Sequence, residues 1–303
     1  MTMPTATPVP DRSRRRARCL AIVAVLACGL AGSIARVAAE PRTAARQHRV
    51  DILYVVPKDP QHRPIYETLK RQRVLEEFKD VLSPYSLPHK LTLRLQGCDG
   101  IENAWYDDED YSVTVCYEYL ARVARDAPRV TTAAGVTPED ALIGPTAEVF
   151  LHEFAHALFD LLNIPVLGRE EDAADMVAAY TLLQFGPKFA RSAVGGVAYM
   201  YHMQANDKPL SAAVAAEDHP LTQQRFFNLL CLAYGADPKT FGDVVEKGYL
   251  PKARAENCEI EYAQIEYAVK TLLRPHMNKV QVKKVRTKLT RKLSEGSANP
   301  LPK

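Results

Sequence analysis

Two histidines and one glutamate lie in the apolar segment LHEFAHALFD, residues 151–160. On a helix, His152 and His156 are one turn apart on the same face, so their imidazoles can bind a single metal ion. Glu153 then lies beside that ion without binding it comfortably. This HExxH pattern predicts a zinc site in which the glutamate acts as general base. The alternative is a pair of histidines that are packed or capped on a half-buried helix.

A catalytic zinc site needs a third protein ligand and an open position for water. The segment REEDAAD offers Glu171 as this ligand, and Asp175 lies one turn further on the same helical face, where it can orient a zinc-binding histidine. Acidic residues at the start of a helix also favour the helix dipole, but this reason does not extend to Asp175. We therefore predict that zinc is held by His152, His156 and Glu171, with Glu170 as the alternative third ligand.

The first 39 residues have the pattern of a secretory signal. A basic head rich in arginine precedes the apolar run CLAIVAVLACGLAGSIA and the small residues VAA before Glu40. We expect cleavage after Ala39 and export to the periplasm or the medium. The alternatives are an uncleaved membrane anchor or a lipoprotein anchored near Cys28.

The export signal carries most of the positive charge of the chain. Residues 1–39 hold six arginines and one aspartate, so the net charge of +3 falls to about −2 when they are removed. Residues 277–303 form a basic C-terminal tail with eight lysines or arginines. Such a tail can contact an anionic membrane surface, although charge runs are more often simply solvated. We expect no nucleic-acid partner.

Four cysteines remain in the chain after the signal. An even number in an exported protein favours two disulfides over free thiols, and three pairings are possible. Linking Cys98 to Cys116 and Cys231 to Cys258 closes the shortest loops at the lowest entropic cost. Zinc binding by these cysteines is not expected, because no CxxC spacing occurs.

The order of the expected elements favours an α+β fold over a doubly wound sheet, because strands come first and helices follow. Two β-type segments at 50–57 and 90–97 flank a helical stretch at 65–82, and residues 103–110 and 111–120 read as two strands around an acidic turn. Further helices are expected from residue 146 onward, at 146–162, 170–185, 222–235 and 261–273.

The pair of motifs, HExxH and then ExxxD on a second helix, resembles that of the gluzincin metallopeptidases. Two other segments resemble the branch that contains the integral-membrane heat-shock and prenyl-protein proteases. The sequence DHPLTQQR reproduces its HP-xxxx-R spacing through His219, Pro220 and Arg225. The other segment looks like its edge strand, which begins Asn-Ala-aromatic, and comprises Asn103, Ala104, Trp105 and Tyr106.

Over roughly residues 50–276, the chain resembles more closely a bacterial metallopeptidase family known as domain of unknown function 4344. The segments HEFAHALFD, GREEDAAD, QRFFNLLC and LPKARAENCEIEYAQ carry this resemblance. It implies a zincin-like metallopeptidase domain at residues 48–276, with a small mixed sheet, an edge strand for substrate and a helical subdomain that holds both motifs. The chain lacks transmembrane helices after the signal, so the membrane-embedded substrates of the membrane proteases are not expected.

Together, the motifs and the resemblance predict a zinc-dependent endopeptidase acting on a peptide or protein substrate. Zinc would polarise the carbonyl and lower the pKa of a water molecule towards ~7. Glu153 would take the proton from that water and pass it to the leaving amine. The peptide would pair antiparallel with residues 103–106. His219 would stabilise the oxyanion, with Tyr180 and Tyr201 as alternative donors.

Two other hypotheses remain open from the sequence. The same residues could hold zinc in a non-proteolytic protein of the cell envelope, although metal holding alone needs no general base such as Glu153. A fortuitous HExxH in a purely structural domain would bind no metal at all.

Overall fold

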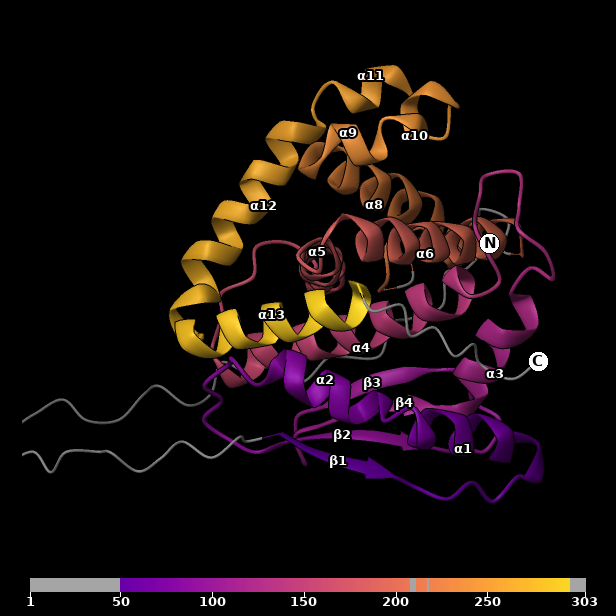
Figure 1. The fold of residues 1–303 in the computed structure, drawn as a ribbon, viewed down its shortest axis with the longest axis vertical. Helices are drawn as coiled ribbons and strands as arrows, with labels where there is room; N and C mark the ends of the chain where they lie inside the picture. The colour runs from indigo at the N-terminus through magenta and orange to yellow at the C-terminus, as the bar shows by residue number, and fades with distance from the viewer. Residues whose placement is uncertain (1–49, 208–210, 217, 295–303) are drawn as a thin grey trace, which may run out of the picture. The chain divides into compact units, whose positions relative to one another are not determined.

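The computed structural model of the chain describes residues 50–207, 211–216 and 218–294. The predicted signal peptide at residues 1–39 and the end of the basic tail at residues 295–303 lie outside the described residues. In the part that is described, all four strands lie within residues 50–116, with two α-helices between β1 and β2, and the other α-helices follow, in an α+β arrangement that confirms the predicted fold class (Figure 1). No helix among these residues combines the length and the apolar character needed to cross a membrane.

The sheet has four strands in the order β1-β2-β4-β3. Their bounds are β1 Val50–Tyr54, β2 Leu91–Gln96, β3 Ala104–Asp107 and β4 Ser112–Cys116. The first, second and fourth strands run parallel, whereas β3 pairs antiparallel with β4, so the sheet is mixed. Every residue of β4 is buried, as expected of a central strand covered on both faces. Strand β3 lies at one edge of the sheet.

Helices make up most of the remaining described chain. Their bounds are η1 Pro60–His62, α1 Arg63–Arg71, α2 Val74–Leu82, α3 Tyr117–Asp126, α4 Asp140–Leu161, α5 Glu170–Leu183, α6 Pro187–Asp207, α7 Ala212–Ala215, α8 Thr222–Ala236, α9 Pro238–Phe241, α10 Asp243–Glu246, α11 Lys252–Ala255, α12 Cys258–Leu272, η2 Arg274–His276 and α13 Lys279–Ser294. The basic tail is therefore helical as far as Ser294.

Three expected boundaries are wrong. The stretch at 65–82 is two helices, because Arg73 has a left-handed backbone with a φ of 58° and separates α1 from α2. The segment 111–120 is a strand only as far as Cys116, because Tyr117 begins α3 and buries its apolar residues at helical spacing. Helix α4 begins at Asp140, six residues before the expected start, and continues through Pro145.

Helix α6 was not expected from the sequence, and a close crossing with α4 accounts for its composition. A Cβ atom added at Gly196 would lie 1.9 Å from the carbonyl oxygen of Asp140, and one at Gly144 would lie 2.4 Å from that of Ala193. Both positions therefore require glycine, because two helix backbones meet there. Gly196 lowers the helix propensity of the α6 sequence while it permits the packing of α6 on α4.

Helix α4 is packed on both sides. Phe150, Phe154 and Leu158 belong to the apolar cluster of the sheet and the helices next to it. Ala147 and Leu151 belong to a second cluster, built mainly from α5, α6 and α8. Because both faces of α4 pack against apolar clusters, its sequence is apolar on all sides. Its few polar residues therefore lie in a buried environment.

The two predicted disulfides are present. Cys98 and Cys116 are joined with sulfurs 2.04 Å apart, and Cys231 and Cys258 with sulfurs 1.99 Å apart. The first bridge ties the loop before β3 to the end of β4, and the second ties α8 to the start of α12.

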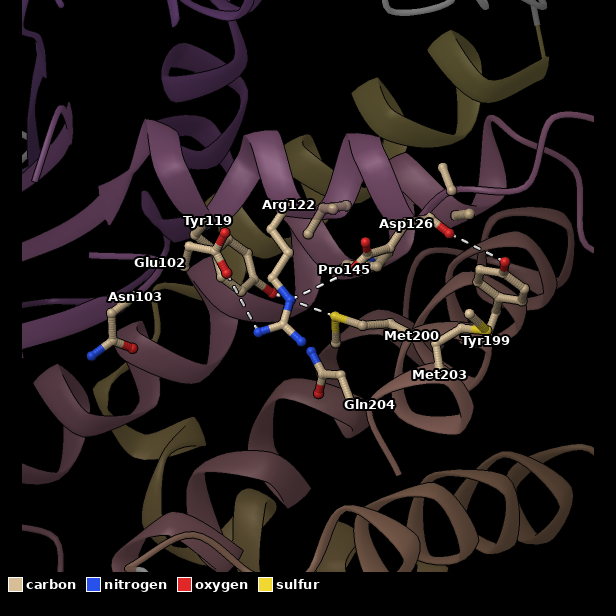
Figure 2. A pocket seen from close by; sticks show the side chains of 13 residues that line it. Glu102, Asn103, Tyr119, Arg122, Asp126, Pro145, Tyr199, Met200, Met203 and Gln204 are labelled. Carbon is tan, nitrogen blue, oxygen red and sulfur yellow. Dashed lines mark hydrogen bonds and ion pairs between the residues drawn. The ribbon is translucent and has the colours of Figure 1, made fainter. Parts of the chain in front are cut away.

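A cavity of about 110 Å³ lies between α3, α4, α6 and the segment that leads into β3 (Figure 2).

Candidate metal centre

Three side chains from α4 and α5 bring potential ligand atoms together. The Nε2 atoms of His152 and His156 are 3.2 Å apart. The Glu171 carboxylate places one oxygen 3.0 Å from His152 Nε2 and the other 3.4 Å from His156 Nε2. In a tetrahedral zinc site with bonds of roughly 2.0–2.1 Å, neighbouring ligand atoms are about 3.3–3.4 Å apart. The three side chains therefore fit three corners of such a site.

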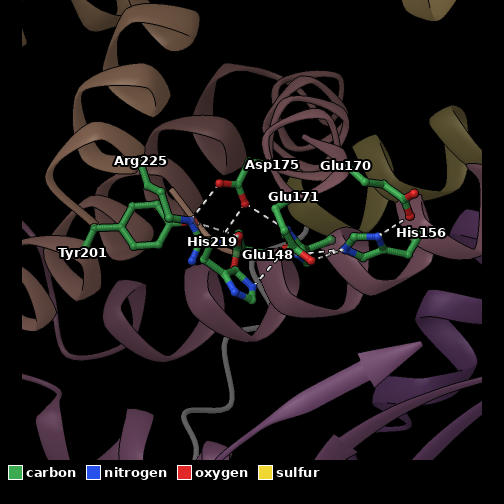
Figure 3. A network of polar contacts seen from close by, with 9 residues as sticks. Glu148, His156, Glu170, Glu171, Asp175, Tyr201, His219 and Arg225 are labelled. Carbon is green, nitrogen blue, oxygen red and sulfur yellow. Dashed lines mark hydrogen bonds and ion pairs between the residues drawn. The ribbon is translucent and has the colours of Figure 1, made fainter. Parts of the chain in front are cut away.

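Carboxylates hold the outer nitrogen of each histidine. Asp175 Oδ1 lies 2.8 Å from His152 Nδ1, and Glu170 Oε1 lies 2.8 Å from His156 Nδ1 (Figure 3). An ionised carboxylate can only accept, so each Nδ1 donates and each Nε2 is left to bind a metal ion. The structure thus places Glu171 at the Nε2 atoms of both histidines and Glu170 at the Nδ1 atom of His156.

A buried network extends behind Asp175. Arg225 on α8 donates from Nε to Asp175 Oδ2 at 2.7 Å and from Nη2 to Asp175 Oδ1 at 2.6 Å. The same Nη2 lies 3.3 Å from Glu148 Oε1, which also accepts the Tyr201 hydroxyl at 2.8 Å. The guanidinium carbon lies 4.6 Å from the centre of the Tyr201 ring. Figure 3 shows this network running from Tyr201 through Arg225 and Asp175 towards the histidines.

Sequence reasoning did not identify Glu148 or the roles of Arg225 and Tyr201 in this network. The local signal for Glu148 is its position one turn before His152, as an acid within an otherwise apolar helix. The HP-xxxx-R spacing singles out Arg225 only by resemblance. Neither its contact with Asp175 nor the contact of Tyr201 with Glu148 follows from a local pattern, because these residues come from α8 and α6.

Negative charge predominates at the site. Burial lowers the pKa of His152, but hydrogen bonds to Asp175 and Glu171 outweigh it and raise this pKa to about 10. Burial raises the pKa of Glu171, yet its hydrogen bonds to His152, His156 and His219 outweigh this effect and lower it. The carboxylates therefore stabilise positive charge between the histidines, where a cation would bind.

Glu153 is buried, with 8% of its surface exposed, and lies on α4 next to His152. Burial raises its pKa, while His152 and His156 act in the opposite direction. A carboxylate whose pKa is raised towards neutrality is a better proton acceptor for catalysis at neutral pH.

His219 reaches the site from the segment before α8. Its Nε2 lies 2.9 Å from Glu171 Oε2, and its ring stacks on that of His152 with the centroids 5.9 Å apart. The side chain of His219 is 53% exposed, so it lies at the mouth of the site. Of the alternative donors, Tyr201 donates to Glu148, and the ring of Tyr180 stacks on that of Tyr262.

The predicted substrate strand is β3, at the edge of the sheet beside α4. Ala104 is buried and Trp105 is partly exposed. Asn103 immediately precedes the strand, and its carbonyl accepts the backbone N–H of Cys116. At the other end, the Tyr106 hydroxyl donates to Asp160 Oδ2 at 2.7 Å, near the C-terminus of α4.

A buried carboxylate fixes the loop between β2 and β3. The Glu118 carboxylate, buried at the start of α3, accepts the backbone N–H of Cys98 at 2.9 Å and of Gly100 at 3.2 Å. Together with the bridge between Cys98 and Cys116, this contact fixes the chain that leads to Asn103.

Comparison with known proteins identifies the family. Neither the curated proteins nor the solved structures yield a significant match. The model of one family, domain of unknown function 4344, matches residues 54–273, a span that includes strands β2, β3 and β4 and the helices of the candidate metal centre. The chain therefore belongs to this family, whose description is "Putative metallopeptidase".

Proposed function

We propose that this protein is a zinc-dependent endopeptidase. The observation that carries the proposal is the convergence of His152, His156 and Glu171, whose ligand atoms lie 3.0–3.4 Å from one another. The carboxylates at both Nδ1 atoms support it further, because they leave each Nε2 free to bind the metal. In the proposed site His152, His156 and Glu171 hold the ion, and the fourth position is left for water or substrate.

A zinc ion at this position supplies Lewis acidity, which polarises the peptide carbonyl and makes a water molecule more acidic. Glu153 accepts a proton from the attacking water and delivers it to the nitrogen of the leaving amine. Its buried position favours this role, because burial holds its pKa above the usual range.

His219 and β3 complete the proposed mechanism. His219 Nε2 donates to the negative charge that develops on the carbonyl oxygen, a role consistent with its exposed position beside Glu171. The free edge of β3 pairs antiparallel with an extended peptide through main-chain hydrogen bonds.

The test uses the mature chain from Glu40, produced with its disulfides, and a library of internally quenched peptides. The expected result is about one zinc per chain and peptide hydrolysis that stops with a chelator and returns with zinc. Cleavage within peptides blocked at both ends would show endopeptidase activity. One bound zinc without hydrolysis of any peptide or protein would favour the zinc-holding envelope protein, and no bound metal would refute the proposal.

A further inference from the structure

Helix α13, Lys279–Ser294, concentrates positive charge. Its sequence KVQVKKVRTKLTRKLS has seven lysines or arginines and no acidic residue. Residues 50–278 have 22 lysines or arginines against 33 aspartates or glutamates, which gives a net charge of −11. The helix is therefore a strongly basic element on an acidic domain.

Polar contacts hold α13 against the rest of the domain. The Asn278 side chain accepts two backbone N–H groups of the first turn, at 2.9 Å and 3.1 Å, so it caps the start of the helix. The backbone N–H of Asn278 donates to the Pro84 carbonyl at 2.8 Å, and the Lys288 ammonium pairs with Asp80 of α2 (Figure 1). The basic helix therefore lies beside α2, at the surface of the domain.

The two sides of α13 differ in exposure. Gln281, Val282 and Val285 are half-buried, so this side of the helix faces the domain. Four cations are exposed and have no carboxylate partner among the residues that the structure describes, namely Lys279, Lys283, Lys284 and Arg286. Positions 279, 283 and 286 are three or four residues apart, so they form one row along the helix. The unpaired cations thus cover a convex surface that faces solvent.

A convex row of cations suits an extended anionic surface better than a small anion. Small anions bind in concave sites where several donors converge, whereas the side chains of this row diverge from the helix axis. A bilayer with anionic lipids presents phosphate groups over a whole plane, and each lysine or arginine near it adds to binding without a defined pocket. Nucleic acid is another extended anion, but the two disulfides argue against it, because disulfides are rare in the cytosol and nucleus.

The acidic domain restricts how the protein can approach such a surface. Attraction between exposed charges falls off within a Debye length of about 8 Å at physiological ionic strength, which is less than the diameter of a helix with its side chains. Cations therefore act on a bilayer only when their own side of the protein touches it. Because residues 50–278 have a net charge of −11, contact through α13 is the orientation that attraction favours.

We propose that α13 docks this protein on an anionic lipid bilayer through Lys279, Lys283, Lys284 and Arg286. The phosphate groups of the lipids attract these cations, so the binding is electrostatic and weakens with salt. The proposal does not depend on the proposed endopeptidase function, because α13 contributes no residue to the candidate metal centre.

The experiment measures co-sedimentation of the mature chain from Glu40, with its disulfides, with lipid vesicles. The wild-type protein should bind vesicles that contain phosphatidylglycerol, should not bind vesicles of phosphatidylcholine alone, and should be released by high salt. The triple variant Lys279→Gln, Lys283→Gln and Lys284→Gln should lower the partition coefficient roughly 100-fold, since each cation near the surface contributes about fivefold. Its urea unfolding midpoint should match that of the wild type, because the three side chains are exposed.

The matched control replaces three exposed lysines outside α13 and removes the same charge, by the changes Lys58→Gln, Lys188→Gln and Lys252→Gln. It should bind phosphatidylglycerol vesicles like the wild type. Equal losses in the two triple variants would overturn the proposal, because total charge rather than α13 would then determine binding. Wild-type binding by the α13 variant, or equal binding of the wild type to both kinds of vesicle, would also overturn it. Binding of the wild type to duplex DNA but not to the anionic vesicles would assign the helix to nucleic acid instead.

Discussion

Arg225 holds Asp175 with two parallel hydrogen bonds of 2.7 Å and 2.6 Å, and Asp175 in turn holds the outer nitrogen of His152. The pair is buried, with the Arg225 side chain 15% exposed and that of Asp175 8% exposed. Arg225 thus connects α8 to the orientation of a proposed zinc ligand on α4. The burial of Asp175 would raise its pKa, but Arg225 and His152 outweigh this effect and keep the carboxylate ionised.

Replacing Arg225 by methionine should lower the free energy of unfolding by about 3–5 kcal/mol, because the charges of Asp175 and Glu148 would be left buried without their cation. Urea unfolding at pH 7 measures this loss. Arg191→Met is the control: its two contacts to Asp243 are equally short at 2.6 Å, but the side chains are 38% and 27% exposed. The exposed pair should contribute roughly 0–1 kcal/mol. Equal losses of unfolding free energy in the two variants would mean that the buried pair stabilises the fold no more than the exposed pair does.

Two glutamates separate metal binding from proton transfer. Glu153→Gln should keep about one zinc per chain and lose roughly 10²- to 10⁴-fold in kcat, because the base is removed but the three ligands remain. Glu171→Ala should lose zinc affinity instead. Zinc content measured by mass spectrometry, together with peptide hydrolysis, distinguishes the two effects.

Glu170→Ala is the comparison for Glu171→Ala. The two residues are neighbours on α5, but Glu171 contacts the Nε2 atoms of the histidines and Glu170 contacts the Nδ1 atom of His156. Glu170 contacts the outer nitrogen of His156, so its loss should weaken zinc binding by about 10- to 100-fold rather than abolish it. A larger loss of zinc from the Glu170 variant than from the Glu171 variant would exchange the roles of these residues.

His219→Phe tests the proposed oxyanion donor. We expect kcat to fall about 10²- to 10³-fold with little change in KM, because the lost hydrogen bond forms only in the transition state. Zinc content should stay at the wild-type level, because His152, His156 and Glu171 are unchanged. Loss of zinc from this variant would instead make His219 a metal ligand, and a wild-type kcat would remove it from the mechanism.

The two disulfides should differ in their effect on substrate binding. Replacing either pair of cysteines by serine should cost about 3 kcal/mol of unfolding free energy, since both close loops of similar length, with separations of 18 and 27 residues. Only loss of the bridge between Cys98 and Cys116 should also raise KM, because this bridge anchors the chain before Asn103 and β3. Steady-state kinetics of both serine variants measure the difference, and an equal rise in KM would argue against a role for β3.

The parts of the site that could be predicted from the sequence are those set by local helix geometry. His152 and His156, and likewise Glu171 and Asp175, are four residues apart, so each pair lies on one face of its helix whatever the rest of the fold does. Arg225 and Tyr201 reach the site only through the packing of α8 and α6 on α4 and α5. The HP-xxxx-R spacing singles out Arg225 by resemblance alone, and its contact with Asp175 depends on packing that no local pattern specifies.

The incorrectly predicted ends of helices and strands also depend on packing between elements that are distant in the sequence. The run SVTVCYEYL is rich in β-formers, but the central strand ends at Cys116, and the apolar residues from Tyr117 onward cover the sheet as a helix. Helix α6 contains a pair of glycines that normally disfavour a helix. The close contact with α4 makes glycine necessary at position 196, and it exists only in the folded chain.

The packing of α4 between two apolar clusters determines how the metal site can open. Local unfolding exposes the least-packed segments first, whereas a helix covered on both faces opens only when the surrounding structure opens with it. We therefore expect His152 and His156 to lie in the part of the domain that unfolds last. Glu171, on the first turn of α5, and the exposed His219 are the side chains that can move without disturbing either cluster. Metal exchange in the native protein should accordingly proceed through motion on the α5 side of the site, and its rate should be independent of global unfolding.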